Sequence, residues 1–333
     1  MTAPEKRIVV LHTGGTLLMQ ERGGILSPSE HDVALEDELP VLTRIARIES
    51  QTLASLDSAD MQPAHWQLIA RATHAALRDP DVDGVVIVHG TDTMAYSASA
   101  VALMLGSVPK PVVFTGAQRP LFEARTDARA NLVDACLLAT LHVPEVGLAF
   151  ASQLLRGVRA TKRDAWHLSA FDSPNLAPLV ELGLAVAVAG HVRAAGPSTL
   201  DDRLDPRVVA LRLFPGFDPR VLDACVALGM RGIVLEAFGT GNLPCLEGSL
   251  VPAIERAAAT GVTVLVVSQC FRGVAELSRY RGGVLAREAG AVAGGDMTAE
   301  AAIAKLMIGL GRYDDASELR RFLDRDVVGE RSV

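Results

Sequence analysis

The alternation of short β-branched runs with longer helical patterns is the feature that most constrains how this chain folds. Four runs in the first half predict buried strands: RIVVL (7–11), GVVIV (84–88), PVVFT (111–115) and VGLAF (146–150). Three stretches between them have helical patterns: 63–78, 94–105 and 127–141. Strands and helices that alternate in this way predict a parallel sheet with helices on both faces.

A second set of such runs begins near residue 208 with VVALRLF, GIVLEAF and VTVLVVSQ, and a helical stretch follows each. The segment AAGPSTLDDRLDPR (194–207) between the two sets is rich in Pro, Asp and Gly, which predicts a linker. The 333 residues, 49% of them hydrophobic, suffice for two cores. We therefore expect two α/β domains: a larger N-terminal one over 1–193 and a smaller parallel-sheet one over 208–333.

Charge and cysteine usage exclude several classes of protein. The formal charge is −7 and the basic residues are scattered, which does not suit a nucleic-acid binder. Apolar runs stay below the ~18 residues of a membrane-spanning helix, and the N-terminal run is short for a signal peptide. The four cysteines lie far apart, without the spacing of a metal site or a disulfide framework. We expect a cytoplasmic protein with no metal, nucleic-acid or membrane partner.

Three of the predicted strands end in turns rich in Gly and Thr: TGGT (13–16), HGTDTM (89–94) and TGAQRP (115–120). Because ligands bind beyond the carboxyl ends of parallel strands, three such turns in one sheet would converge on one crevice. None of the turns carries the Lys of a phosphate loop, and the chain has no GxGxxG, HExxH or GxSxG motif. Hydroxyl chemistry is the class of reaction that remains.

A Thr hydroxyl is a poor nucleophile until a base takes its proton. Asp92 directly follows Thr91, and Lys162 lies in ATKRDAWH (160–167) after the fourth strand. A Lys acts as a base when burial favours its neutral form and a carboxylate orients it. Thr91, Lys162 and Asp92 are therefore a candidate proton relay, although Lys162 taken alone also suits a solvated surface position.

These motifs together resemble the bacterial L-asparaginases, and most of all their cytoplasmic type I branch. The similarity continues through further segments, namely DSADM (57–61), FDSPNL (171–176), GTGNLP (239–244), SQC (268–270) and GGDMTAEAAIAKL (294–306). The resemblance implies a larger N-terminal catalytic domain and a smaller C-terminal one. It also implies hydrolysis of the side-chain amide of L-asparagine to L-aspartate and ammonia without a cofactor.

The resemblance implies a role for each matching residue of the relay. Thr16 in TGGT takes the position of the nucleophile that forms a covalent acyl-enzyme. Thr91, Lys162 and Asp92 take the positions that carry protons and activate the hydrolytic water. Backbone N–H groups near Thr91 and Ala117 would hold the oxyanion.

Other matching residues imply substrate binding and assembly. Asp57 and Ser58 match the positions that bind the α-amino and α-carboxylate groups, and a turn that caps the helix beginning near Pro63 is compatible with this role. Asn242 in GTGN matches a residue that reaches the site from a neighbouring subunit. The resemblance therefore implies a homodimer or a homotetramer built as a dimer of dimers.

The sequence departs from the family pattern at two places. The loop LLMQERGGILSPSE (17–30) has no Tyr, and Ile25 falls about where the family carries the Tyr that helps to activate the nucleophile. Tyr280 is a candidate replacement from a partner subunit, and simple interface packing is the alternative. At the position of an effector-binding Arg of some type I enzymes the chain has Glu236, while Cys270 matches the accompanying Cys. We therefore predict no positive cooperativity.

The motifs leave the exact amide substrate open. Asparagine and glutamine differ by one methylene, and a pocket discriminates a methylene by only ~1–3 kcal/mol. A glutaminase-asparaginase or another ω-amidase is the near alternative to an asparaginase. A non-catalytic regulator that binds asparagine is a second alternative, which the missing loop Tyr favours and the intact relay opposes.

Overall fold

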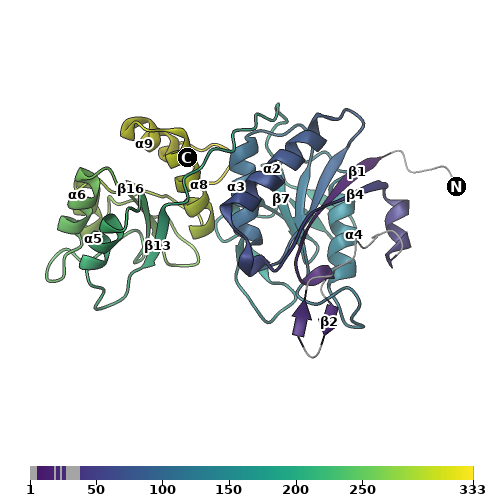
Figure 1. Cartoon of the computed structure of the whole chain (residues 1–333), viewed down its shortest axis with the longest axis horizontal. Coiled ribbons are helices and arrows are strands. Elements are labelled where there is room, and N and C mark those ends of the chain that lie inside the picture. Colours follow the sequence, from purple (N-terminus) through teal and green to yellow (C-terminus); the bar gives the residue numbers. More distant parts are fainter. Residues whose placement is uncertain (1–5, 19, 23–24, 28–37, 333) are drawn as a thin grey trace. The chain divides into compact units, whose positions relative to one another are not determined.

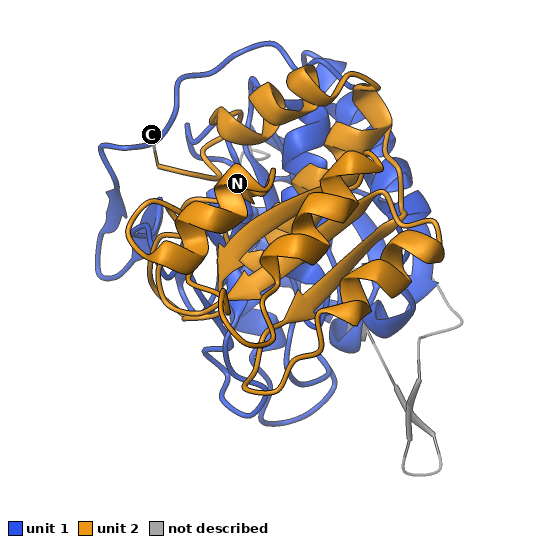
Figure 2. Ribbon diagram, turned by 90° about the vertical axis from the view of Figure 1, so that its left-hand side faces the viewer, with its two compact units in different colours: residues 1–202 blue, residues 203–333 orange. Residues whose placement is uncertain are grey.

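The structure, a computed structural model, describes residues 6–18, 20–22, 25–27 and 38–332. The chain divides into two compact units, Met1–Asp202 and Arg203–Val333, which Figure 2 draws in blue and orange. The first unit holds a large, mainly parallel sheet flanked by helices, and the second holds a smaller parallel sheet. The predicted α/β fold class is therefore confirmed.

The first unit is built on an eight-stranded sheet with the strand order β12-β11-β8-β7-β6-β5-β1-β4. Its strands are β1 (Arg7–Gly14), β4 (Arg47–Leu56), β5 (Gly84–Val88), β6 (Val112–Thr115), β7 (Val146–Phe150), β8 (Gln153–Arg156), β11 (Val180–Leu182) and β12 (Val186–Val188). The five neighbouring strands β7, β6, β5, β1 and β4 pair in parallel. Strands β8, β11 and β12 extend the sheet with antiparallel pairs.

Three helices cover this sheet, with α2 (Pro63–Arg78) and α3 (Met94–Leu105) on one face and α4 (Ala128–Leu138) on the other (Figure 1). Strand residues alternate between the faces, so every second one contacts the α4 side. One buried cluster joins strands to α4 through Ile8, Val10, Val86, Val88, Val113, Leu132, Ala135 and Cys136. The predicted helix and strand ranges match these elements to within a few residues.

Short elements complete the first unit. They are η1 (Thr16–Leu18), β2 (Gln20–Arg22), β3 (Ile25–Ser27), η2 (Pro40–Arg44), η3 (Ser58–Asp60), η4 (Gly157–Arg159), β9 (Thr161–Lys162) and β10 (Phe171–Asp172). Strands β2 and β3, which come after η1 in the chain, pair with each other in antiparallel register. Strands β9 and β10 pair Lys162 with Phe171, which is buried.

The second unit contains a four-stranded parallel sheet in the order β13-β14-β15-β16. The strands are β13 (Val208–Arg212), β14 (Gly232–Ala237), β15 (Thr263–Ser268) and β16 (Val292–Ala293), and the helices are α5 (Arg220–Ala227), α6 (Val251–Ala259), α7 (Arg281–Glu288), α8 (Ala299–Arg312) and α9 (Ala316–Asp324). One buried cluster joins β14 and β15 to α5, α6 and α7. Helix α8 packs closely on β14, because a Cβ added at Gly232 would lie 2.7 Å from Leu306.

Candidate active site

The turn after β1 places Thr16 by means of two glycines in the left-handed region. Gly14 and Gly15 have φ angles of +100° and +91°, which side chains rarely allow. A Cβ added at Gly14 would lie 2.3 Å from the backbone of Leu56, and one added at Gly15 would lie 2.4 Å from that of Gly90. The turn therefore presses against β4 on one side and against the HGTDT turn on the other.

The remaining strand-end turns meet in the same way. A Cβ added at Gly90 would lie 2.5 Å from the Ser58 side chain, and one added at Gly116 would lie 2.2 Å from the carbonyl oxygen of His89. The Thr93 hydroxyl also donates a 2.8 Å hydrogen bond to the Ser58 carbonyl. The structure thus brings the TGGT, DSADM, HGTDTM and TGAQRP segments together at the carboxyl ends of their strands.

Thr91, Asp92 and Lys162 form one hydrogen-bonded group in this region. Lys162 Nζ lies 2.8 Å from Thr91 Oγ1 and 2.7 Å from Asp92 Oδ1. The side chain of Lys162 is 17% exposed and Thr91 is buried, whereas the Asp92 side chain is 65% exposed. Lys162 is therefore not the solvated surface lysine of the alternative interpretation, and it donates to both partners at once.

The opposite side of Thr91 contacts Gln118, which the sequence did not single out. The Thr91 hydroxyl donates to Gln118 Oε1 at 3.0 Å. The N–H groups of Gln118 and Arg119 donate at 3.0 Å to the two oxygens of Asp127, which is buried at the start of α4. Asn131, one helical turn further on, donates to the Gly116 carbonyl at 3.0 Å. The only sequence signal for this group was the proximity of TGAQRP to the N-terminus of the next helix.

His89 is a buried imidazole immediately before Gly90. Its Nδ1 lies 2.7 Å from the Gly90 carbonyl oxygen, so Nδ1 carries the proton and donates. Burial lowers the pKa of His89 to about 4, and the hydrogen bond to Gly90 opposes this only in part. The ring is therefore neutral at pH 7 and stiffens the HGTDT turn without adding charge.

The predicted substrate-binding residues of the first unit occupy different environments. Asp57 is exposed and accepts the Ala59 N–H at 2.9 Å, so it caps η3. Helix α2 instead begins after Gln62, so capping by Asp57 applies to the short helix before it. Ser58 and Ala117 are both buried, at the turns described above.

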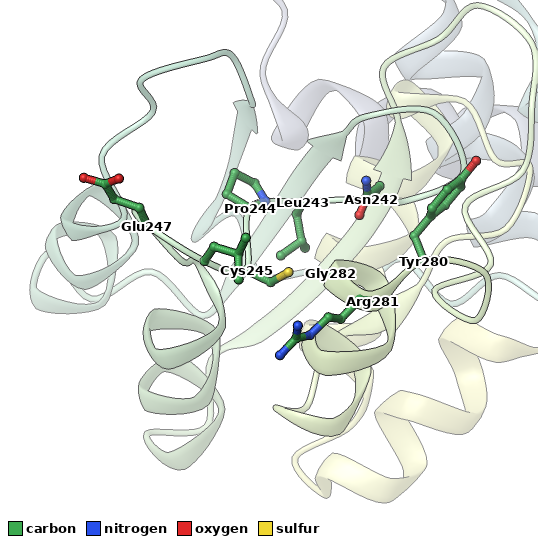
Figure 3. Close-up of a pocket in the computed structure, with 9 residues that line it drawn as sticks. Asn242, Leu243, Pro244, Cys245, Glu247, Tyr280, Arg281 and Gly282 are labelled. Carbon is green, nitrogen blue, oxygen red and sulfur yellow. The ribbon is translucent and has the colours of Figure 1, made fainter.

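Two further predicted residues, Asn242 and Tyr280, lie together in the second unit. They line a hollow of about 380 Å³ whose wall also includes Cys245 and Glu247. Figure 3 shows Asn242 and Tyr280 at one end of this hollow and Glu247 at the other. Tyr280 is 51% exposed and directly precedes α7, and a Cβ added at Gly282 would lie 2.8 Å from Asn242 Oδ1. The second unit thus presents the amide of Asn242 and the phenol of Tyr280 from neighbouring segments.

The negative charge of Glu236 is partly offset by a neighbouring arginine, which the sequence did not indicate. Strands β13 and β14 pair Arg212 with Glu236, and their side chains form an ion pair of 3.5 Å. Cys270 is exposed and its N–H donates to Ser268. The side chains of the 17–30 loop beyond Leu17, including Ile25, lie outside the described residues.

Within residues 6–332, apart from the gaps named above, no helix is long and apolar enough to span a membrane. Nor does any group of His, Cys, Asp or Glu side chains in that part of the chain have the arrangement of a metal site.

Both domains match known protein families. Residues 7–193 match the asparaginase N-terminal domain, and residues 207–323 match the glutaminase/asparaginase C-terminal domain. An L-asparaginase of Thermococcus kodakarensis is 37% identical over 97% of this chain and 98% of its own length. The solved structure of the thermostable L-asparaginase from that organism superposes with a TM-score of 0.89 at 36% identity, covering 98% of this chain and 99% of the other.

Two further relatives also match nearly the whole of this chain, and one of them carries a different name. L-asparaginase 1 of Escherichia coli K12 is 34% identical over 98% of both chains. The 60 kDa lysophospholipase of Mus musculus is 35% identical over 99% of this chain, which spans 63% of that relative's length. Fold, site and these matches together define an amidohydrolase. More particularly, the chain belongs to the asparaginase family, which confirms the resemblance carried by its motifs.

Proposed function

We propose that this protein is an L-asparaginase that converts L-asparagine to L-aspartate and ammonia through a threonine acyl-enzyme. The observation that carries the proposal is the double contact of Lys162 Nζ with Thr91 Oγ1 and Asp92 Oδ1, at 2.8 and 2.7 Å. A hydroxyl joined to an amine that a carboxylate orients is an arrangement suited to moving protons. The relatives named L-asparaginase support an amide as the substrate.

In the proposed reaction, Thr16 Oγ1 attacks the carbon of the side-chain amide and gives up its proton. Backbone N–H groups near Thr91 and Ala117 hold the negative charge that forms on the carbonyl oxygen, and one such donor contributes ~3 kcal/mol. The C–N bond then breaks, and the proton that Thr16 gave up leaves on the ammonia, so that an ester remains on Thr16. Water then loses a proton to the Thr91–Lys162 relay and attacks the ester carbon. The ester C–O bond breaks, aspartate is released, and the relay returns the proton to Thr16 Oγ1.

Substrate binding in this proposal uses both units. Asp57 and Ser58 bind the α-amino and α-carboxylate groups, and Asn242 completes the site from a neighbouring subunit. Asn242 and Tyr280 line the same hollow, which supports a joint role for these two side chains. The proposal therefore includes a homodimer or homotetramer located in the cytoplasm. Size-exclusion chromatography with light scattering tests the oligomeric state, and cell fractionation tests the location.

The near alternative is a glutaminase-asparaginase or another ω-amidase. The matched C-terminal domain family is named for both glutaminase and asparaginase, which keeps glutamine as a candidate substrate. A non-catalytic regulator that binds asparagine is less well supported, because a sensor has no need of the Lys162 relay. Ammonia release from asparagine and glutamine at equal concentrations separates the three possibilities.

Variants of the relay test the mechanism directly. Thr16→Ala and Thr91→Ala should each abolish turnover in a folded protein. Lys162→Met should do the same while calorimetry still detects aspartate binding. Lys110→Met is the matched control, because Lys110 donates to the Asp79 carbonyl in a different part of the unit. Near-native turnover in either threonine variant would contradict the mechanism.

Tyr280 is the proposed replacement for the missing loop Tyr, acting on Thr16 from a partner subunit. Tyr280→Phe keeps the ring and removes the hydroxyl, so we expect the acylation rate to fall about tenfold, or ~1.4 kcal/mol, with the same oligomeric state. Single-turnover kinetics measures this rate. An unchanged rate would mean that Tyr280 only packs at the interface.

A further inference from the structure

We propose that Gln118 is a positioning residue for Thr91, and that Asp127 and Asn131 form a buried frame that holds Gln118 in place. The inference rests on the proposed reaction, because it assigns to Thr91 a role in the proton relay. It adds to that reaction three residues outside the Thr–Lys–Asp group.

The contacts of Thr91 fix its hydroxyl from two sides. A hydroxyl has one proton to donate and two lone pairs to accept with. The Thr91 proton points to Gln118 Oε1 at 3.0 Å, and one lone pair accepts from Lys162 Nζ at 2.8 Å. Gln118 thus holds Thr91 Oγ1 against Lys162 before substrate binds. Rotation about the Cβ–Oγ1 bond turns this proton from Gln118 toward Lys162 Nζ while the oxygen stays in place. In the proposed reaction the O–H bond then breaks, and a lone pair on Nζ takes the proton.

The carboxylate of Asp127 determines where Gln118 lies. Its Oδ2 accepts the Gln118 N–H at 3.0 Å and the Asn131 amide at 3.1 Å, while Oδ1 accepts the Arg119 N–H at 3.0 Å. Three donors converge on this one group, and Asp127 is only 7% exposed. Because Asp127 lies at the start of α4, the turn that carries Gln118 is tied to a helix in the core.

Asn131 extends the frame to two strands. Its amide nitrogen donates to the Gly116 carbonyl at 3.0 Å, directly after β6. Its carbonyl oxygen accepts the Ala151 N–H at 3.2 Å, directly after β7. Asn131 is 3% exposed, so these bonds are shielded from water. The TGAQ turn therefore keeps its position relative to both strand ends.

Substitution of Gln118 tests the positioning role. Gln118 is half-buried and lies in a turn, so its variants should fold. We expect Gln118→Met, which keeps the length but not the acceptor, to lower kcat for asparagine about tenfold, or ~1.4 kcal/mol, with KM changed less than threefold. Gln118→Glu keeps an acceptor oxygen and should restore most of the loss. Equal effects of the two variants, or a kcat within twofold of the wild type in Gln118→Met, would overturn the assignment.

Substitution of Asp127 tests the frame. Asp127→Asn offers an acceptor on one side only and sets an NH₂ group against a backbone N–H on the other. We expect its crystal structure to show Gln118 Oε1 moved out of hydrogen-bond distance from Thr91, with kcat reduced at least as much as in Gln118→Met. Asp134→Asn on the same helix is the matched control, because Asp134 accepts the Ser152 hydroxyl at 3.1 Å and the Asn carbonyl oxygen can still accept it.

The crystal structures keep this test separate from that of the reaction itself. If the wild type releases ammonia from neither asparagine nor glutamine, the proposed function fails, whereas the positions of Thr91 and Gln118 in the wild type and in Asp127→Asn still decide the frame. A Thr91–Gln118 contact that persists near 3.0 Å in Asp127→Asn would overturn it.

Discussion

A methyl group added at Gly15 should push apart the two proposed catalytic threonines, Thr16 and Thr91. A Cβ at Gly15 would lie 2.4 Å from both Cα and N of Gly90 and 2.8 Å from the carbonyl carbon of His89. An ordinary contact needs at least 3.4 Å, and all three atoms belong to the backbone, so the two turns must move apart by about 1 Å. Thr16 and Thr91 move with these turns.

The expected effect of Gly15→Ala has two parts. The φ of +91° costs an L-residue about 1–2 kcal/mol in stability. A displacement of about 1 Å in the reacting groups costs ~100-fold in rate, because catalysis depends on a near-attack geometry. We therefore expect kcat/KM for asparagine to fall about 100-fold. The free energy of unfolding should fall by more than the about 1–2 kcal/mol that the backbone strain costs by itself.

Gly216→Ala is a matched control for this experiment. Gly216 has a φ of +96°, but a Cβ there would meet nothing within 4 Å. This variant carries the same backbone strain without the collision, so it should lose about 1–2 kcal/mol of stability and keep its activity. Steady-state ammonia release and chemical denaturation measure both quantities. A Gly15→Ala enzyme within threefold of the wild-type kcat/KM would refute the reasoning.

His89 has a pKa of about 4 in the folded protein and of 6.5 in the unfolded chain. Below pH 6.5 the unfolded chain therefore binds a proton that the folded protein does not bind. The free energy of unfolding falls for this reason by about 3 kcal/mol between pH 6.5 and pH 4. His89→Gln should flatten that part of the pH profile in denaturant titrations, and an equal slope would contradict this. Lys305→Met should cost about 3–5 kcal/mol, because it leaves the fully buried Glu330 without its 2.6 Å partner; a loss below 1 kcal/mol would count against it. Asparagine saturation should be hyperbolic, since Glu236 repels an effector carboxylate and Arg212 only partly offsets its charge. A Hill coefficient clearly above one would show otherwise.

The sequence predicted the central strands because they are buried on both faces and therefore consist of continuous apolar runs. It did not predict β4, whose residues Arg47–Leu56 are mostly polar and exposed at the sheet edge. It also missed the antiparallel extension through β8, β11 and β12, since three- and four-residue strands leave little periodicity. Burial gives a strand a compositional signature, and edge strands lack it.

The site shows the same division. The Gly/Thr turns are local motifs, because a left-handed backbone needs glycine, and they were recognisable in the chain alone. The contact between Gly15 and Gly90 and the position of Gln118 against Thr91 depend on pairing in the sheet, and no local pattern encodes them. Asp127 likewise reads as an ordinary residue at the start of a helix, until the fold turns two backbone N–H groups and an amide toward its carboxylate. Sequence alone thus determined which residue types were available, and tertiary structure decided which of them touch, because hydrogen bonds and close contacts form between atoms that lie far apart along the chain.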